Sequence, residues 1–194
     1  VRKCQRYLMV SWLLLGIGIG LGSVWAYVVL GWGGYWGWDA VENASLLPWL
    51  VGVALIHSLT VYRQRGAFKR WSIMCACITF AFVVLGTFIS RSGLIQSVHA
   101  FAGDPVSLYL FGTLIVVSIL AGAIGLAFRW KRFGAKSASD EDVDSLASRE
   151  AAYYFNNVIM VILAVLICYL TVASALPRWL PFGGSAVSTG TFDA

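Results

Sequence analysis

Five long apolar stretches dominate the sequence and constrain its fold more than any other feature. As helices, each is about long enough to cross a hydrocarbon layer of ~30 Å at 1.5 Å per residue. Charged residues make up 12% of the chain, against about 25% in soluble domains, which is too few to cover a water-soluble body. The sequence therefore predicts an all-α integral membrane protein with a single membrane domain of about five transmembrane helices. The predicted spans are residues 7–30, 46–62, 71–89, 106–128 and 153–176.

Basic residues alternate between the connectors of these spans. Of the 14 lysines and arginines, all but Arg91 and Arg178 lie before residue 7 or in the second and fourth connectors. Because basic loops stay on the side from which a protein is inserted, these connectors are predicted to be internal, including the polar loop 131–150. The external side is predicted to carry residues 32–49, the loop at 92–105 and the C-terminal tail.

Residues 32–42, WGGYWGWDAVE, form the most unusual segment of the chain, here called the tryptophan segment. Aromatic side chains at membrane interfaces commonly anchor helix ends, and this explains some of the tryptophans. Glycines between the aromatic residues permit tight bends, so the segment can also form a flat apolar platform for a planar ligand. We weigh the platform above the anchoring belt. The aromatic residues are Trp32, Tyr35, Trp36 and Trp38.

Polar residues follow the aromatic ones directly. Asp39 or Asn43 can cap the start of a helix through its side chain, whereas Glu42 and Asn43 can equally orient the edge of a ligand. Pro48 is expected in the first turn of the second span, where no helical N–H is needed.

The chain has two histidines, His57 and His99. His57 lies inside the second span, where an ionisable side chain is by default a functional candidate; the alternative is a neutral histidine bonded to a neighbouring helix. His99 lies on the predicted external side with the tryptophan segment, and neutral imidazole is a good ligand for haem iron. Arg91, on that side too, either extends to the interface or pairs with a carboxylate such as a propionate.

Three other patterns are expected to be structural. Glycines in residues 16–22 follow no strand and lie within an apolar span, which favours close helix packing over nucleotide binding. Asn156 and Asn157 are expected to form hydrogen bonds between helices. No nucleic-acid partner is expected. The cysteines are expected to remain unpaired and to act as small apolar side chains. They are Cys4, Cys75, Cys77 and Cys168.

The stretch LGWGGYWGWDAVENASLLPWL, residues 30–50, resembles the WWD signature of the haem-handling protein superfamily. Within that superfamily it most resembles the CcmF family, the haem lyase component of cytochrome c maturation. The sequences ALIHSLT around His57, TFISRSGLIQSVHAFA around His99 and SREAAYYFNN before the last span agree with this family, so the resemblance covers essentially the whole chain.

The resemblance implies a role for each candidate residue. The tryptophan segment would receive haem from a haem chaperone, with His99 as an iron ligand. His57 would ligate a permanent transmembrane haem b, which would reduce the first haem with quinol as electron source. The product would be a thioether to the C-x-x-C-H motif of an apocytochrome c; no catalytic side chain is assigned. The segment residues concerned are Trp32, Trp36, Trp38, Asp39 and Glu42.

The histidine count departs from the family, which uses two external and two membrane histidines where this chain has one of each. The chain would therefore be a central portion of a longer protein or a split-gene subunit completed by a companion chain. The resemblance implies a bacterial or mitochondrial inner membrane, with the tryptophan segment facing the periplasm or intermembrane space. The alternative function is a non-catalytic haem-binding or structural subunit of a respiratory membrane complex.

Overall fold

The computed structural model describes residues 1–31, 33–133 and 149–185, and every regular element in these residues is a helix. Five of the helices are long and apolar enough to cross a membrane, which confirms the predicted all-α membrane fold. The elements are α1 (Arg2–Trp25), its π-helical extension η1 (Ala26–Leu30), α2 (Ala40–Arg65), α3 (Lys69–Arg91), α4 (Pro105–Phe128), the short α5 (Trp130–Phe133), α6 (Arg149–Val172) and η2 (Ala173–Ala175).

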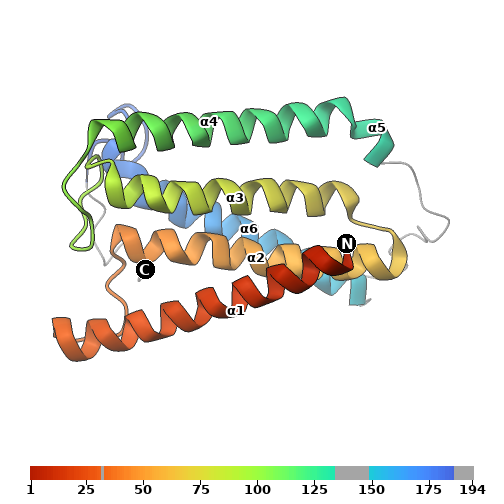
Figure 1. Cartoon of the computed structure of the whole chain (residues 1–194), viewed down its shortest axis with the longest axis horizontal. Coiled ribbons are helices and arrows are strands. Elements are labelled where there is room, and N and C mark those ends of the chain that lie inside the picture. Colours follow the sequence, from red (N-terminus) through yellow and green to blue (C-terminus); the bar gives the residue numbers. More distant parts are fainter. Residues whose placement is uncertain (32, 134–148, 186–194) are drawn as a thin grey trace.

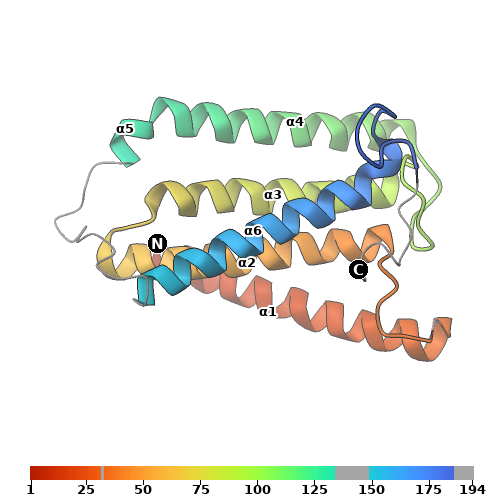
Figure 2. The same cartoon turned by 180° about the vertical axis from the view of Figure 1, so that it is seen from behind.

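The helices α1 to α4 lie side by side in chain order, and α6 crosses behind α2 and α3 (Figures 1 and 2). Helix α2 is central, because it packs against α1, α3 and α6, whereas α4 packs on α3 and α5 alone among the described elements. No residue of α4 is buried, so its apolar side chains are available to lipid.

The two ends of the bundle differ in character. One end, here called the tryptophan end, carries the tryptophan segment, the loop 92–104 and residues 173–185 after α6 (Figure 1). The opposite, basic end carries the N-terminus, the α2–α3 connector and α5 (Figure 1). Of the predicted internal loop 131–150, residues 134–148 lie outside the described residues, and its edges belong to α5 and α6.

Helix α2 begins six residues earlier than the apolar pattern predicted. Asp39 caps it, and Glu42 accepts a hydrogen bond from the Asp39 backbone N–H, so the two form a capping box. The expectation that Pro48 lies in the first turn is therefore wrong: Pro48 is inside α2, eight residues after its first residue, Ala40. Membrane helices tolerate such prolines because neighbouring helices and local adjustment compensate for the lost bond.

Two stacked tryptophans join α1 to α2. The rings of Trp12 and Trp49 lie 5.1 Å apart, and Trp12 Nε1 donates to the Trp49 carbonyl at 3.2 Å. Gly16 and Gly52 make room for this pair, since an added Cβ would meet Trp49 Nε1 at 2.8 Å and Trp12 Cδ1 at 3.1 Å respectively. The packing role predicted for the glycines at 16–22 thus holds for Gly16.

Polar side chains fix the antiparallel register of α2 and α6. Asn43 Nδ2 donates to Thr171 Oγ1 at 3.0 Å near the tryptophan end. Asn157 Nδ2 donates to Ser58 Oγ at 3.0 Å toward the other end. Together with Asn156, described below, Asn157 confirms the prediction of hydrogen bonds between helices. All four cysteines are unpaired, as expected.

The apolar core lies where α2, α3 and α6 meet, and it holds these helices together beneath the tryptophan end. It is centred on Leu47, Val51, Ala54, Cys75 and Ala164, each with no measurable exposure.

Candidate functional site

The tryptophan segment folds back onto the first turn of α2. The Glu42 carboxylate accepts hydrogen bonds from the backbone N–H groups of Gly37, at 3.0 Å, and Asp39, at 3.2 Å. Asn43, which is fully buried, donates to the Trp38 carbonyl at 3.1 Å. Trp38 has φ +54°, a value that non-glycine residues rarely adopt. The residues of α2 thus hold the segment in a conformation that its own sequence would not favour.

The loop 92–104 is closed at its base by two glycines. Gly93 has φ +70°, and a Cβ on it would lie 2.7 Å from the Gly103 Cα, so only glycines allow this approach. The Phe101 N–H donates to the Ser90 carbonyl across the same base. Ile95 is buried with Ala40 at the start of α2. The loop is therefore anchored beside the α2 cap, where it presents His99.

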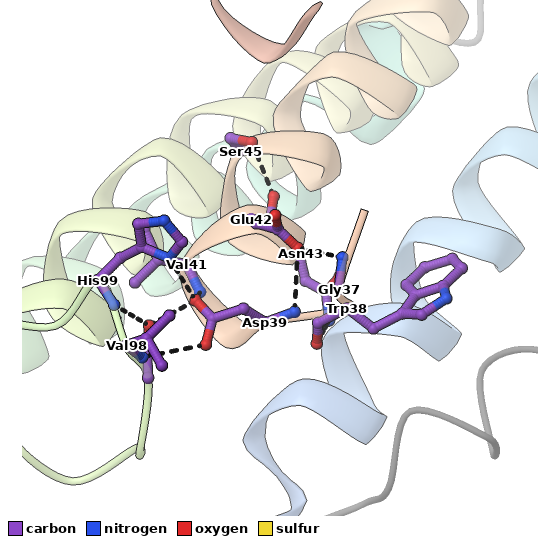
Figure 3. A network of polar contacts seen from close by, with 10 residues as sticks. Gly37, Trp38, Asp39, Val41, Glu42, Asn43, Ser45, Val98 and His99 are labelled. Carbon is purple, nitrogen blue, oxygen red and sulfur yellow. Dashed lines mark hydrogen bonds and ion pairs between the residues drawn. The ribbon is translucent and has the colours of Figure 1, made fainter. Parts of the chain in front are cut away.

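The Asp39 carboxylate connects this loop to α2. Its Oδ2 accepts hydrogen bonds from the Val41 N–H, at 3.2 Å, and from the Ser97 hydroxyl, and it lies 3.0 Å from His99 Nδ1. Its Oδ1 accepts from the Val98 N–H at 3.3 Å. Figure 3 shows Val41, Val98 and His99 gathered around this one carboxylate. Asp39 therefore has two functions, as helix cap and as partner of the histidine.

A groove of about 280 Å³ opens between α1 and the start of α2, and His99 lines it. Gly18 and Gly22 form part of its α1 wall, and there is open space where a Cβ on either would be. Trp25 contacts the His99 ring, with ring centres 5.9 Å apart. The other lining residues are Leu15, Ile19, Ser23, Trp36, Val41, Glu42 and Ser45. The groove thus joins an imidazole to an aromatic and apolar wall.

The structure separates the predicted site residues at this end. Trp36 lines the groove with His99, whereas Trp38 points away from His99 (Figure 3) and meets Trp36 edge-on at 6.2 Å. Arg91 does not line the groove; its guanidinium lies over the Phe101 ring at 4.1 Å. Trp32 lies outside the described residues.

His57 lines a second groove of about 460 Å³ along the same α1–α2 seam. The Asn156 side-chain amide lies 3.0 Å from His57 Nδ1, and the Tyr153 ring is 5.2 Å from the imidazole, so α6 holds the ring. The remaining lining is apolar and comes from Met9, Val10, Trp12, Leu13, Val53 and Ile56.

The two histidines belong to two separate sites. His57 is 18 residues after Asp39, a helical rise of about 27 Å, and His99 lies beside Asp39. The Trp12–Trp49 stack lies between the two grooves along the seam, since Trp12 also lines the His57 groove. No single iron can be bound by both imidazoles. His57 is also eight residues from the end of α2 at Arg65, and is therefore nearer the basic end.

Sequence reasoning missed three contributors to these sites. Ser97 bonds both Asp39 and the His99 N–H, and its position two residues before a histidine in a loop was the available signal. Trp25 is the last residue of α1, and it meets His99 only because the loop 92–104 folds back beside α1. Asn156 was expected to bond between helices, but its partner His57 was not foreseen.

Sequence comparisons relate the chain to known proteins. Residues 2–96 match the family model described as cytochrome C assembly protein. The "Cytochrome c-type biogenesis protein CcmF" of Haemophilus influenzae is 40% identical over 99% of the chain and 29% of its own length, and that of Escherichia coli gives the same values. The CcmF of Pseudomonas aeruginosa is 47% identical over 81% of the chain and 23% of its own length. No solved structure matches.

The chain is an all-helical membrane protein that belongs to the cytochrome c assembly family, as the family model and the CcmF relatives show. Within it, the relatives matched across most of the chain include the CcmF proteins of cytochrome c biogenesis. The chain spans less than a third of the length of these relatives.

Proposed function

We propose that this chain forms the haem-holding part of a cytochrome c haem lyase, with haem bound in the His99 groove for attachment to an apocytochrome c. The observation that carries this proposal is the groove itself, in which one imidazole faces a wall of indole rings and glycines. Flat apolar walls and one strong nitrogen ligand are the features that an iron porphyrin requires.

Each residue of the groove has a part in this function. His99 supplies an iron ligand, Trp25 and Trp36 supply aromatic surface, and Gly18 and Gly22 leave the α1 wall open. Bound haem supplies the vinyl groups that form thioethers with the apocytochrome cysteines. Glu42 serves the fold of the segment, because its carboxylate already accepts two backbone N–H groups.

His57 is proposed to ligate a second, permanent haem b in the larger groove. Its apolar lining suits a porphyrin within the membrane, and Asn156 on α6 fixes the imidazole from its Nδ1 side. Electrons from quinol would reach the first haem through this one. Because each groove offers one histidine, further ligands are proposed to come from a companion chain or from other segments.

The tryptophan end is proposed to face the periplasm or intermembrane space of an inner membrane. The basic residues gathered at the opposite end support this orientation through the positive-inside rule. A haem chaperone and the apocytochrome would then approach the same end. For Arg91, the contact with Phe101 supports a role in closing the loop, next to the groove rather than in it.

The test is to purify the intact complex with each histidine changed separately to alanine. His99→Ala is expected to lose the haem captured at the tryptophan end and to stop cytochrome c maturation, while the permanent haem signal stays. His57→Ala is expected to remove the permanent haem signal. Undiminished capture and maturation in His99→Ala would refute the lyase site. Stable residence in a respiratory complex, with no chaperone or apocytochrome bound, would favour the structural alternative.

A further inference from the structure

An ionised Asp39 carboxylate can accept hydrogen bonds but cannot donate them. This determines which ring nitrogen of the neighbouring His99 carries the hydrogen. Val41, Val98 and Ser97 all donate to this carboxylate. His99 Nδ1, 3.0 Å from Oδ2, must therefore carry a hydrogen and donate as well. A neutral imidazole protonated at Nδ1 has its lone pair on Nε2. Asp39 thus selects the ring nitrogen that can bind a metal.

We propose that Asp39 is a positioning residue that acts on haem through His99 and does not itself contact haem. The inference rests on the proposed function and deepens it, because it assigns the aspartate of the tryptophan segment to orienting the iron ligand His99. Histidine ligands commonly donate their other ring N–H to a carboxylate, which fixes their orientation and raises their basicity.

The Asp39 carboxylate also attaches His99 to a rigid part of the fold. Asp39 is the cap of α2, the most buried helix of the bundle, and His99 comes from a loop pinched at Gly93 and Gly103. Ser97 joins the two by bonding the Asp39 side chain and the His99 N–H. A loop histidine therefore takes its orientation from a helix terminus, and movement of the α2 cap would be transmitted to the iron ligand.

The negative charge of Asp39 is also expected to affect the midpoint potential of the haem. A negative carboxylate at Nδ1–H makes the imidazole a stronger electron donor, which favours ferric over ferrous haem. Loss of that charge should therefore weaken ligation and raise the midpoint potential of the haem at the tryptophan end. Asparagine at position 39 would keep the helix cap, because asparagine and aspartate cap helices about equally well.

The test is Asp39→Asn in the intact complex, with haem affinity, ligation spectrum and midpoint potential measured at the tryptophan end. We expect roughly 10- to 100-fold weaker haem binding, as is typical when a group that hydrogen-bonds to a metal ligand is removed, together with a higher midpoint potential. The matched control is Asp104→Asn, which alters another aspartate cap at the same end that bonds Val106 and Ser107 and not His99. The control should leave all three readouts unchanged.

A double-mutant cycle separates positioning from direct contact. If Asp39 acts through His99, then adding Asp39→Asn to His99→Ala should change residual haem binding by less than about twofold. Additive losses would overturn the proposal, as would an Asp39→Asn chain with unchanged affinity and potential while His99→Ala loses haem. If His99→Ala itself retained haem, the proposed function would fail first and this inference with it.

Discussion

Filling the His99 groove from its α1 side tests the site without touching any polar contact. Gly18 lines the groove, and no atom lies within 4 Å of where its Cβ would be. The cavity left by removing one large apolar side chain is about 150 Å³, so leucine at this position would fill on the order of half of the 280 Å³ groove. The helix should tolerate the change, since leucine is a far better helix former than glycine.

The expected result follows from the energy of overpacking. A ligand that must displace an added side chain meets a penalty of about 1–3 kcal/mol, which corresponds to roughly 5- to 150-fold weaker binding. Gly18→Leu should therefore lower haem affinity at the tryptophan end by this factor and leave the haem at His57 unchanged. The assay is haem titration of the purified complex, followed by absorbance.

Gly20→Leu is the matched control, because Gly20 also has open space around its Cβ position but does not line the groove. The two substitutions add the same side chain two residues apart on α1, so a general effect on α1 or on membrane insertion would appear in both. Equal haem affinity in the Gly18→Leu, Gly20→Leu and parent chains would refute the assignment of this groove.

Two further predictions concern the loop that carries His99 and the helix that follows it. Gly93→Ala places a side chain in the left-handed backbone region, at a cost of roughly 1–2 kcal/mol, and its Cβ would also press against Gly103. Haem retention at the tryptophan end should therefore fall. The control Gly125→Ala, at an open position, should have no effect. The pKa of the exposed Asp104 carboxyl is lowered, chiefly by the hydrogen bond from the Ser107 side chain. The stabilisation from the ionised Asp104 carboxylate should be complete above its unfolded-state pKa of about 3.9. It should be lost as the pH falls through the lower pKa of the folded state. The melting temperature of Asp104→Asn should therefore lack this decrease at acid pH.

Local sequence predicted the start of α2 only in part. Asp39 was a candidate cap, and it is the cap. The apolar pattern nevertheless placed the start of α2 six residues too late. Hydropathy marks where a helix can enter lipid, whereas the hydrogen bonds of the helix can begin before that point. The same shift moved Pro48 from the expected first turn into the helix interior.

The aromatic segment shows a second limit. Proximity in sequence suggested one platform containing Trp36 and Trp38, yet a backbone with φ +54° at Trp38 directs that side chain away from His99. The indole that joins Trp36 at the groove is Trp25, at the end of α1. Only the packing of α1 on α2 decides this, because no short-range pattern reports which residues meet across two helices.

The sequence by itself determined that the chain is a helical membrane protein of the cytochrome c assembly type, since span length, hydropathy and a continuous motif are local properties. Tertiary structure decided how the histidines are used. It placed His99 on the Asp39 carboxylate and His57 beside Asn156, in two grooves with the Trp12–Trp49 stack between them. The reason is physical: Asp39 is 60 residues from His99 and His57 is 99 from Asn156, so only helix packing could bring these partners together.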